Sequence, residues 1–207
     1  MNDRKLKLVL KGTRNYVQGS TILDEATRLL REAGYPQLAG VKFLIYEMTN
    51  SNLEMTVEAL RDKAPAADSV AILSFEADGE VTQARIRQVE GSPHVRVPYD
   101  ESAIVSRCQI DPAARSIRLT QHDFGFSPIE VFVSMNKALH LAVLEKSEAT
   151  NWVFCRLDCP AWPVRVSDLS GVTITLKQAL GTRLTRAGVE LGQQKLGEIY
   201  FSAKAAS

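Results

Sequence analysis

The sequence lacks the features that mark an exported, membrane-spanning or nucleic-acid-binding protein. It has only three cysteines, Cys108, Cys155 and Cys159, an odd set that fits reduced thiols better than a disulfide framework. The N-terminus is polar, and no apolar run approaches the roughly 20 residues that cross a bilayer. Lys and Arg total 25 against 24 Asp and Glu, so no bulk charge attracts nucleic acid or anionic lipid. We therefore expect a cytoplasmic protein with no nucleic-acid or membrane partner.

Familiar catalytic signatures are also missing. The chain has no Walker phosphate loop, no G-x-G-x-x-G, no G-x-S-x-G and no H-E-x-x-H. Cys155 and Cys159 have C-x3-C spacing, but no second Cys/His pair completes a zinc set. We expect no metal and no other cofactor.

What is present is an ordinary globular composition, with 45% hydrophobic and 24% charged residues. Alternation over residues 6–11 predicts a first strand. Apolar residues recur at helical spacing over 22–33, and Gly34 ends this helix. Asp78-Gly79 is typical of a tight hairpin turn. Four further strands are predicted, at 41–49, 53–60, 70–76 and 80–89.

The same order of elements returns in the second half. Residues 116–120 predict a strand and 127–145 a long helix, which Ser127, Pro128 and Glu130 begin with a capping signature. Four strands are predicted at 152–157, 172–177, 182–191 and 195–203. Residues 61–69 and 159–171 are extra loops of the first and second copy. The domain boundaries that follow are 1–91 for the first repeat, 92–114 for a connector and 115–207 for the second repeat.

The two predicted helices differ in their surroundings. The first has a charged face in which Glu25, Arg28 and Glu32 are spaced to pair, so it is expected to be half exposed. The second is apolar almost all round and is expected to be buried. Asn136 and His140 lie four residues apart on its apolar stripe. Buried polar groups need partners, so these two side chains either face a ligand tunnel or form a core network.

A strand, a long helix and four antiparallel strands, given twice, resemble the hot-dog superfamily of acyl-thioester thioesterases and hydroxyacyl-acyl-carrier-protein dehydratases. The segment from Gly19 to Asp24 is similar to the Gly-x-x-x-x-acid stretch that opens the central helix in the dehydratases. The resemblance implies an α+β double hot-dog fold, with two antiparallel curved sheets each wrapping a central helix. It also implies an acyl-CoA or acyl carrier protein as partner. The oligomeric state is left open, with a homodimer as one option.

The resemblance implies a catalytic pair and a set of substrate contacts. Asp24 would be the acid and His122, in a loop before the second helix, the base contributed by the other repeat. Gly19 would present backbone N–H groups to the thioester carbonyl. Asn15, Tyr16 and Asn136 would contact the substrate.

Structural interpretations compete with each of these roles. Asp24 lies three residues after Thr21 and fits a capping box at a helix start. Asp123, next to His122, fits a role in turn geometry. Trp162 lies between two prolines, in a rigid loop that either covers a site or pins the edge of the sheet.

The function expected from the resemblance is that of a 3-hydroxyacyl-ACP or 3-hydroxyacyl-CoA dehydratase. An acyl-thioester thioesterase is one alternative, and a non-catalytic acyl-binding or assembly protein of the same fold is another. Two ferredoxin-like units are a further alternative for the architecture, but those need two helices per repeat.

Overall fold

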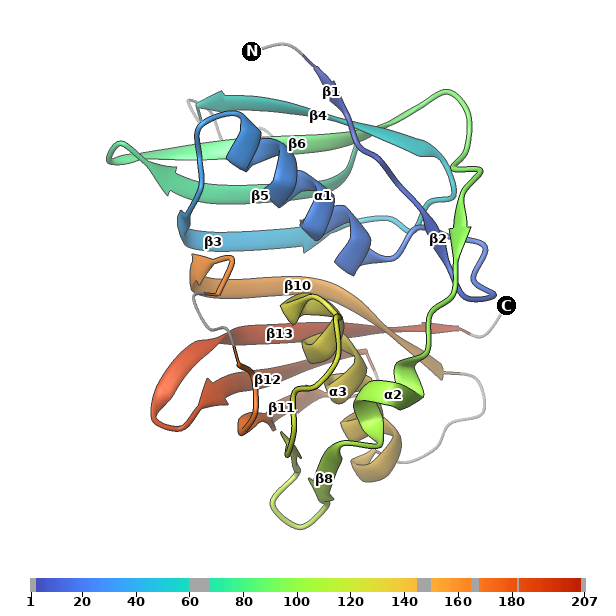
Figure 1. Cartoon of the computed structure of the whole chain (residues 1–207), viewed down its shortest axis with the longest axis vertical. Helices are drawn as coiled ribbons and strands as arrows, with labels where there is room; N and C mark the ends of the chain where they lie inside the picture. The colour runs from blue at the N-terminus through green and yellow to red at the C-terminus, as the bar shows by residue number, and fades with distance from the viewer. Residues whose placement is uncertain (1–2, 60–67, 145–149, 165–167, 182, 206–207) are drawn as a thin grey trace. The chain divides into compact units, whose positions relative to one another are not determined.

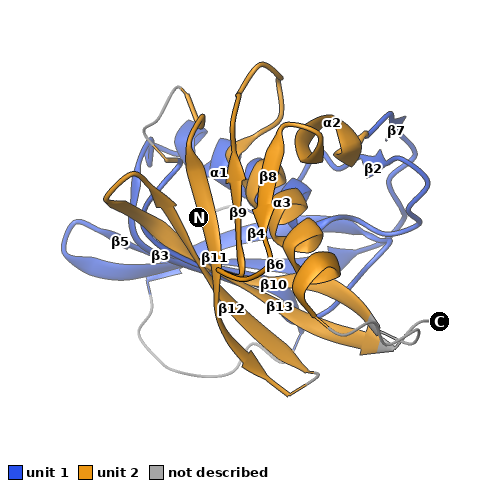
Figure 2. Cartoon of the chain, turned by 90° about the horizontal axis from the view of Figure 1, so that it is seen from below, with its two compact units in different colours: residues 1–99, 158–163 blue, residues 100–157, 164–207 orange. Residues whose placement is uncertain are grey.

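The computed structural model describes residues 3–59, 68–144, 150–164, 168–181 and 183–205 (Figure 1). The chain divides into two compact units, which Figure 2 colours separately. Unit 1 comprises residues 1–99 and 158–163, and unit 2 comprises residues 100–157 and 164–207. Each unit contains one long helix and a set of antiparallel strands, and unit 1 also contains one short parallel pair.

Unit 1 contains a helix whose apolar stripe is buried. The helix α1 spans Gly19–Glu32 and lies across the sheet in Figure 1. Its strands, in chain order, are β1 (Arg4–Lys5), β2 (Leu10–Lys11), β3 (Leu38–Ile45), β4 (Asn52–Ala59), β5 (Ser69–Ala77), β6 (Glu80–Val89) and β7 (Arg96–Val97). Ile22, Leu23, Ala26 and Leu30 of α1 are buried, as the helical spacing predicted.

Unit 2 has the same kind of architecture around a more apolar helix. The helix α3 spans Pro128–Val143, and its buried residues include Ile129, Phe132 and Leu139. The other elements are α2 (Glu101–Val105), β8 (Cys108–Asp111), β9 (Ser116–Leu119), β11 (Val172–Leu180), β12 (Leu184–Leu191), β13 (Gln194–Ala205) and β10 (Thr150–Trp162), of which residues 158–162 belong to unit 1. The expected burial holds for most of α3, but Leu141 near its end is 62% exposed.

The strands of the two units pair in different orders, although the elements of the two units follow the same order along the chain. In unit 1 the strand order is β1-β4-β6-β5-β3, with every neighbouring pair antiparallel. In unit 2 it is β8-β9-β11-β12-β13-β10, so β11, β12 and β13 form a simple meander. In unit 1, by contrast, the last strand β6 lies between β4 and β5. The two copies are therefore alike in sequence order but not in strand pairing.

Several predicted boundaries need correction. The first predicted strand is interrupted. Residues 4–5 pair with β4, whereas residues 10–11 pair with β7. The backbone N–H of Leu10 donates to Val95 O in this second pairing. The second copy's extra loop begins later than expected, since β10 runs through to Trp162, which is buried. Pro160 therefore lies within β10 and does not end it.

Other predicted features agree with the structure or lie outside its described part. The hairpin turn is confirmed, with positive φ at Asp78 and Gly79. The short helix α2, in the predicted connector, was missed because five residues carry no helical periodicity. Most of the predicted extra loop at 61–69 lies outside the described residues, as do Leu60, Thr182 and Glu145 at predicted element ends.

The capping signature predicted for α3 is confirmed. The Glu130 backbone N–H donates to Ser127 Oγ at 3.4 Å, and the Ser127 N–H donates to Glu130 Oε2 at 2.8 Å. Two of the helix's otherwise unpaired donors are thereby satisfied. Capping accounts for the burial of Glu130 without any catalytic role.

Replacing Ser127 with alanine is expected to lower the free energy of unfolding by about 1 kcal/mol, because the Glu130 N–H loses its acceptor. Urea denaturation followed by tryptophan fluorescence measures the change. Ser92→Ala is the matched control, since Ser92 is exposed and outside any helix or strand. Equal effects of the two substitutions would contradict the role given to the cap.

Candidate functional site

The candidate site in unit 2 is built around His122, in the loop that leads into α3. Two residues of the segment before β11 hold this histidine. The His122 backbone N–H donates to Ser170 Oγ at 2.9 Å, and the Leu169 backbone N–H donates to His122 Nδ1 at 3.3 Å. The side chain is 16% exposed. The imidazole is therefore fixed by residues almost 50 positions away along the chain. No local sequence motif predicts these contacts.

The hydrogen bond from Leu169 determines which nitrogen of the neutral imidazole carries the proton. Because Nδ1 accepts a backbone N–H, the proton lies on Nε2. The Nε2 atom is buried and has no hydrogen-bond partner among the described residues. His122 thus presents an unused N–H donor.

Aromatic rings surround this donor on one side. The Phe124 ring meets the His122 ring edge-on at 5.0 Å, and Phe126 meets Phe124 at 5.5 Å. A hydrogen bond from Nε2 would form in a poorly hydrated setting, where it is stronger than in water.

Two acidic residues lie near His122, and both accept hydrogen bonds from other residues. Asp123 pairs with Arg107 and accepts a hydrogen bond from Gln121 Nε2 at 3.1 Å. Asp168 Oδ1 is 3.8 Å from His122 Nδ1, and hydrogen bonds from Ser170 hold the pKa of Asp168 below its usual value. Asp123 therefore binds Arg107 and Gln121, and its predicted role in turn geometry stays a prediction.

Asn136 lies on α3, in the same unit, with a side chain that is fully buried. Neither Nδ2 nor Oδ1 of its amide has a hydrogen-bond partner within the described parts of the chain. An unpaired buried amide costs on the order of 1–3 kcal/mol. Asn136 is thus a second unused polar group, and its predicted contact with substrate stays a prediction.

His140, one turn further along α3, belongs to the core. Its Nε2 lies 2.9 Å from Thr185 Oγ1, and its ring stacks on Trp152 at 5.1 Å and meets Phe201 edge-on at 5.1 Å. Burial lowers the pKa of His140 to about 4. The imidazole is neutral at physiological pH and acts as a packing group.

Unit 1 carries the remaining predicted site residues. Gly19 is the first residue of α1, so its neighbouring backbone N–H groups are those of a helix start. Asp24 is half-buried and lies in the second turn, while Asn15 is exposed and Tyr16 half-buried in the preceding loop. The capping box predicted for Thr21 and Asp24 is wrong, because the helix begins earlier, after Gln18. Thr21 Oγ1 is buried with no described hydrogen-bond partner.

The predicted site residues are thus divided between the units. His122 and Asn136 lie in unit 2, and Asp24, Gly19, Asn15 and Tyr16 lie in unit 1. The pairing of Asp24 with His122 stays a prediction. Sequence reasoning missed Leu169 and Ser170, whose only signal was the turn-forming composition of their segment.

No model of a known protein family matches this sequence, and no curated protein is similar to it. Among solved structures, acyl-CoA thioesterase II TesB2 from Mycobacterium marinum is similar at 12% identity and a TM-score of 0.46, over 97% of this chain and 96% of that one. The tesB protein of Mycobacterium avium subsp. paratuberculosis has 11% identity and a TM-score of 0.45, over 97% and 91%. The dehydratase domain from the CurF module of curacin polyketide synthase has 9% identity and a TM-score of 0.43, over 93% and 85%.

The described residues include neither a membrane-crossing helix nor a cluster of metal-ligating side chains. No helix there is long and apolar enough to cross a membrane. No group of three or more His, Cys, Asp or Glu side chains in the described part is placed to hold a metal ion. Burial raises the pKa of the Cys108 thiol to about 11 and that of Cys159 to about 12, so both stay protonated at neutral pH.

The tautomer of His122 can be tested by nitrogen-15 NMR. In its neutral form, Nδ1 is expected to show the chemical shift of an unprotonated ring nitrogen and Nε2 that of a protonated one. The His122→Gln variant assigns the signals, because they disappear with the ring. A proton on Nδ1 would contradict the hydrogen bond from Leu169.

The burial of His140 predicts a specific pH dependence of stability. Its pKa is about 4 in the folded chain against an ordinary value of 6.5. Between these values the unfolded chain binds the proton and the folded one does not, so stability is complete above pH 6.5 and falls as the pH is lowered toward 4.

Within this window the loss is expected to be about 1.4 kcal/mol per pH unit. It is measured as the difference between the wild-type chain and His140→Gln in denaturant titrations. His94→Gln is the control, because His94 is exposed. Parallel pH profiles for the wild-type chain and His140→Gln would show that the buried imidazole does not resist protonation.

Proposed function

We propose that this chain is an acyl-thioester-processing protein of double hot-dog fold, with repeats at 1–91 and 115–207 and a connector at 92–114. The observation that carries the proposal is the unused, buried Nε2–H of His122 beside Phe124. A thioester carbonyl has an oxygen that accepts this hydrogen bond, on a group apolar enough to lie against aromatic rings. The donor stabilises negative charge that develops on that oxygen during reaction.

The architecture supports this proposal independently of His122. Each unit sets one long helix against an antiparallel sheet, and α3 carries Asn136, a second buried polar side chain with no described partner. The Asn136 amide offers both a donor and an acceptor. In a bound acyl thioester, the hydrogen-bond donors and acceptors that could pair with this amide lie in the thioester group and the carrier arm. The acyl chain is apolar and fills apolar space.

The finer reaction we propose is the reversible dehydration of a 3-hydroxyacyl thioester. A base removes a proton from the α-carbon, the hydroxyl leaves the β-carbon as water after receiving a proton, and an enoyl thioester is formed. Asp24 is the proposed group for proton transfer. His122 was assigned as the base from the sequence, but Leu169 opposes the tautomer that a base at Nε2 requires, so its proposed role becomes that of donor to the thioester carbonyl.

Two alternatives use the same carbonyl contact. In a thioesterase, water attacks the carbonyl that His122 polarises, and the thiol leaves. In a non-catalytic acyl-binding protein, His122 and Asn136 only hold the thioester. The tautomer of His122 specifically favours this last alternative over a histidine base.

Turnover is tested by incubating the chain with acyl, enoyl and 3-hydroxyacyl thioesters of coenzyme A and of acyl carrier protein. Loss of water from the 3-hydroxyacyl thioester is expected, with release of free thiol as the mark of a thioesterase. Asp24→Asn and His122→Ala are each expected to slow turnover about a hundredfold or more, since each removes a group that acts in the transition state.

Matched controls separate these roles from general damage. Glu32→Gln removes an exposed carboxylate of α1, and His94→Ala removes an exposed imidazole; both should leave turnover unchanged. Saturable binding of acyl thioesters without turnover would support the binding protein instead. If no thioester binds or reacts, the proposed function is wrong.

A further inference from the structure

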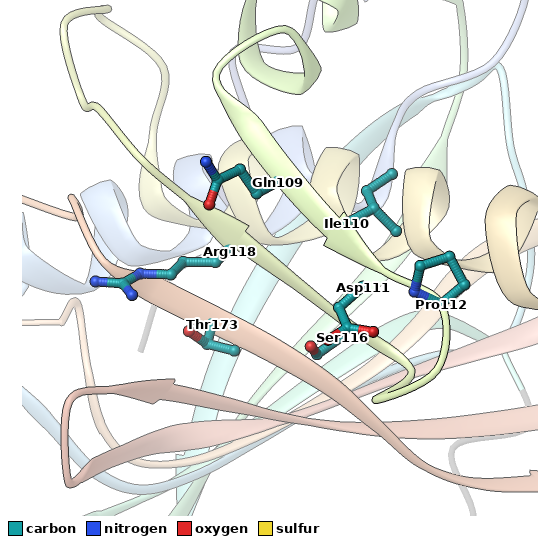
Figure 3. A pocket seen from close by; sticks show the side chains of 7 residues that line it. All are labelled: Gln109, Ile110, Asp111, Pro112, Ser116, Arg118 and Thr173. Atoms are coloured by element: carbon teal, nitrogen blue, oxygen red, sulfur yellow. The ribbon is translucent and has the colours of Figure 1, made fainter.

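A shallow hollow of mixed polar and apolar lining lies over β8, β9 and β11 of unit 2, which run side by side (Figure 3). Its volume is about 590 Å³. The residues that line it are Gln109, Ile110, Asp111, Pro112, Ser116, Arg118 and Thr173. None of them was predicted as a site residue.

Arg118 is the only basic residue among those lining the hollow. Its side chain is exposed and has neither a hydrogen bond nor an ion pair with any described residue. Arg85, by contrast, is paired with Glu58 and Asp68. The Arg118 guanidinium therefore keeps its full set of donors for a ligand.

The strand register places two further hydrogen-bonding side chains beside Arg118. Gln109 on β8 and Thr173 on β11 are its direct cross-strand neighbours, and Figure 3 shows the arginine between them. Directly opposed residues have Cβ atoms about 5 Å apart, so the three side chains can reach one ligand group. The Thr173 hydroxyl donates to Gly171 O at 3.3 Å, a long bond that it can exchange for a ligand oxygen.

This end of the hollow matches an anion such as a phosphate. A guanidinium fork binds phosphate oxygens with two parallel hydrogen bonds, and neutral amide and hydroxyl donors add to it. The guanidinium lies beside Gly171: a Cβ at that position would be 3.7 Å from Arg118 Nη2, an ordinary van der Waals contact.

The other end of the hollow has a different character. Asp111 and Ser116 face each other there, with Ile110 and Pro112 alongside (Figure 3). A carboxylate repels a second anion but accepts hydrogen bonds from hydroxyl or amide groups. The hollow thus fits an ester of phosphate whose organic arm carries such donors and some apolar surface, better than it fits a free phosphate ion.

The hollow adjoins the segment that holds His122. The Gly171 N–H donates to Leu119 O at 2.7 Å, directly after Arg118, while Leu169 and Ser170 bond His122. The geometry points to a phosphate-ester site at Arg118, Gln109 and Thr173 that binds the phosphopantetheine arm of the thioester carrier. The choice of phosphopantetheine among phosphate esters rests on the proposed function.

The site is tested by calorimetric titration of the full chain with coenzyme A, 4′-phosphopantetheine and pantetheine. The two phosphorylated ligands are expected to bind about tenfold or more tightly than pantetheine, because only they engage Arg118. Arg118→Gln should remove this advantage, and Arg118→Lys should restore part of it. Arg183→Gln is the matched control, because Arg183 is exposed and lies in the turn before β12.

Equal affinities for pantetheine and coenzyme A, or affinities that Arg118→Gln leaves unchanged, would overturn the inference. Titration with holo and apo acyl carrier protein then separates the two sources of the arm. If Arg118→Gln weakens binding of the holo carrier protein alone, the ligand of the site is the arm of the carrier protein. If it weakens binding of coenzyme A alone, the ligand is coenzyme A.

Failure of the site and failure of the proposed function give different results. Binding that depends on Arg118 without turnover of any thioester keeps the site and refutes an enzyme. Turnover with a KM unaffected by Arg118→Gln keeps the enzyme and refutes the site. When both hold, Arg118→Gln raises the KM of phosphorylated thioesters and leaves that of pantetheine thioesters unchanged.

Discussion

The burial of one long helix against one antiparallel sheet governs the structure of each unit. An apolar stripe on α1 or α3 gains stability only when a sheet covers it, and the strands alternate inward and outward to provide that cover. Everything polar on the covered side must then find a partner or remain unsatisfied. In α3 this constraint leaves His140 neutral among aromatic rings and leaves the Asn136 amide without a described partner.

The chemistry proposed for the chain follows from one hydrogen bond, which forms in the loop that leads into α3. The Leu169 N–H fixes the proton of His122 on Nε2 and so makes the imidazole a donor. A donor polarises a carbonyl, whereas a base would need the opposite tautomer. The distinction separates binding or carbonyl activation from proton abstraction, which a histidine identified by type alone does not reveal.

The hollow over β8, β9 and β11 of unit 2 adds a second kind of site to the same loop segment. Leu169 and Ser170 form hydrogen bonds with His122, and Gly171 lies beside Arg118. A thioester substrate has a reactive end and a phosphorylated arm, and these two neighbouring places offer one carbonyl contact and one phosphate contact. The two halves of the proposal are therefore chemically complementary while resting on separate observations.

The sequence by itself determined the elements and their order, because the period of apolar residues is a local property. The helix with its Ser127 capping signature, the hairpin at Asp78-Gly79 and nearly all strands could be predicted in this way. The start of α1 could not, since Thr21 and Asp24 imitate a capping box in a helix that begins at Gly19. Only the tertiary structure decided the strand order, in which β6 lies between β4 and β5 while β11, β12 and β13 form a meander. It also decided that Leu169 orients His122. Finally, it placed Arg118 opposite Gln109 and Thr173 on the neighbouring strands. These are contacts between residues far apart along the chain, and their partners are selected by the packing of whole elements rather than by neighbouring residues.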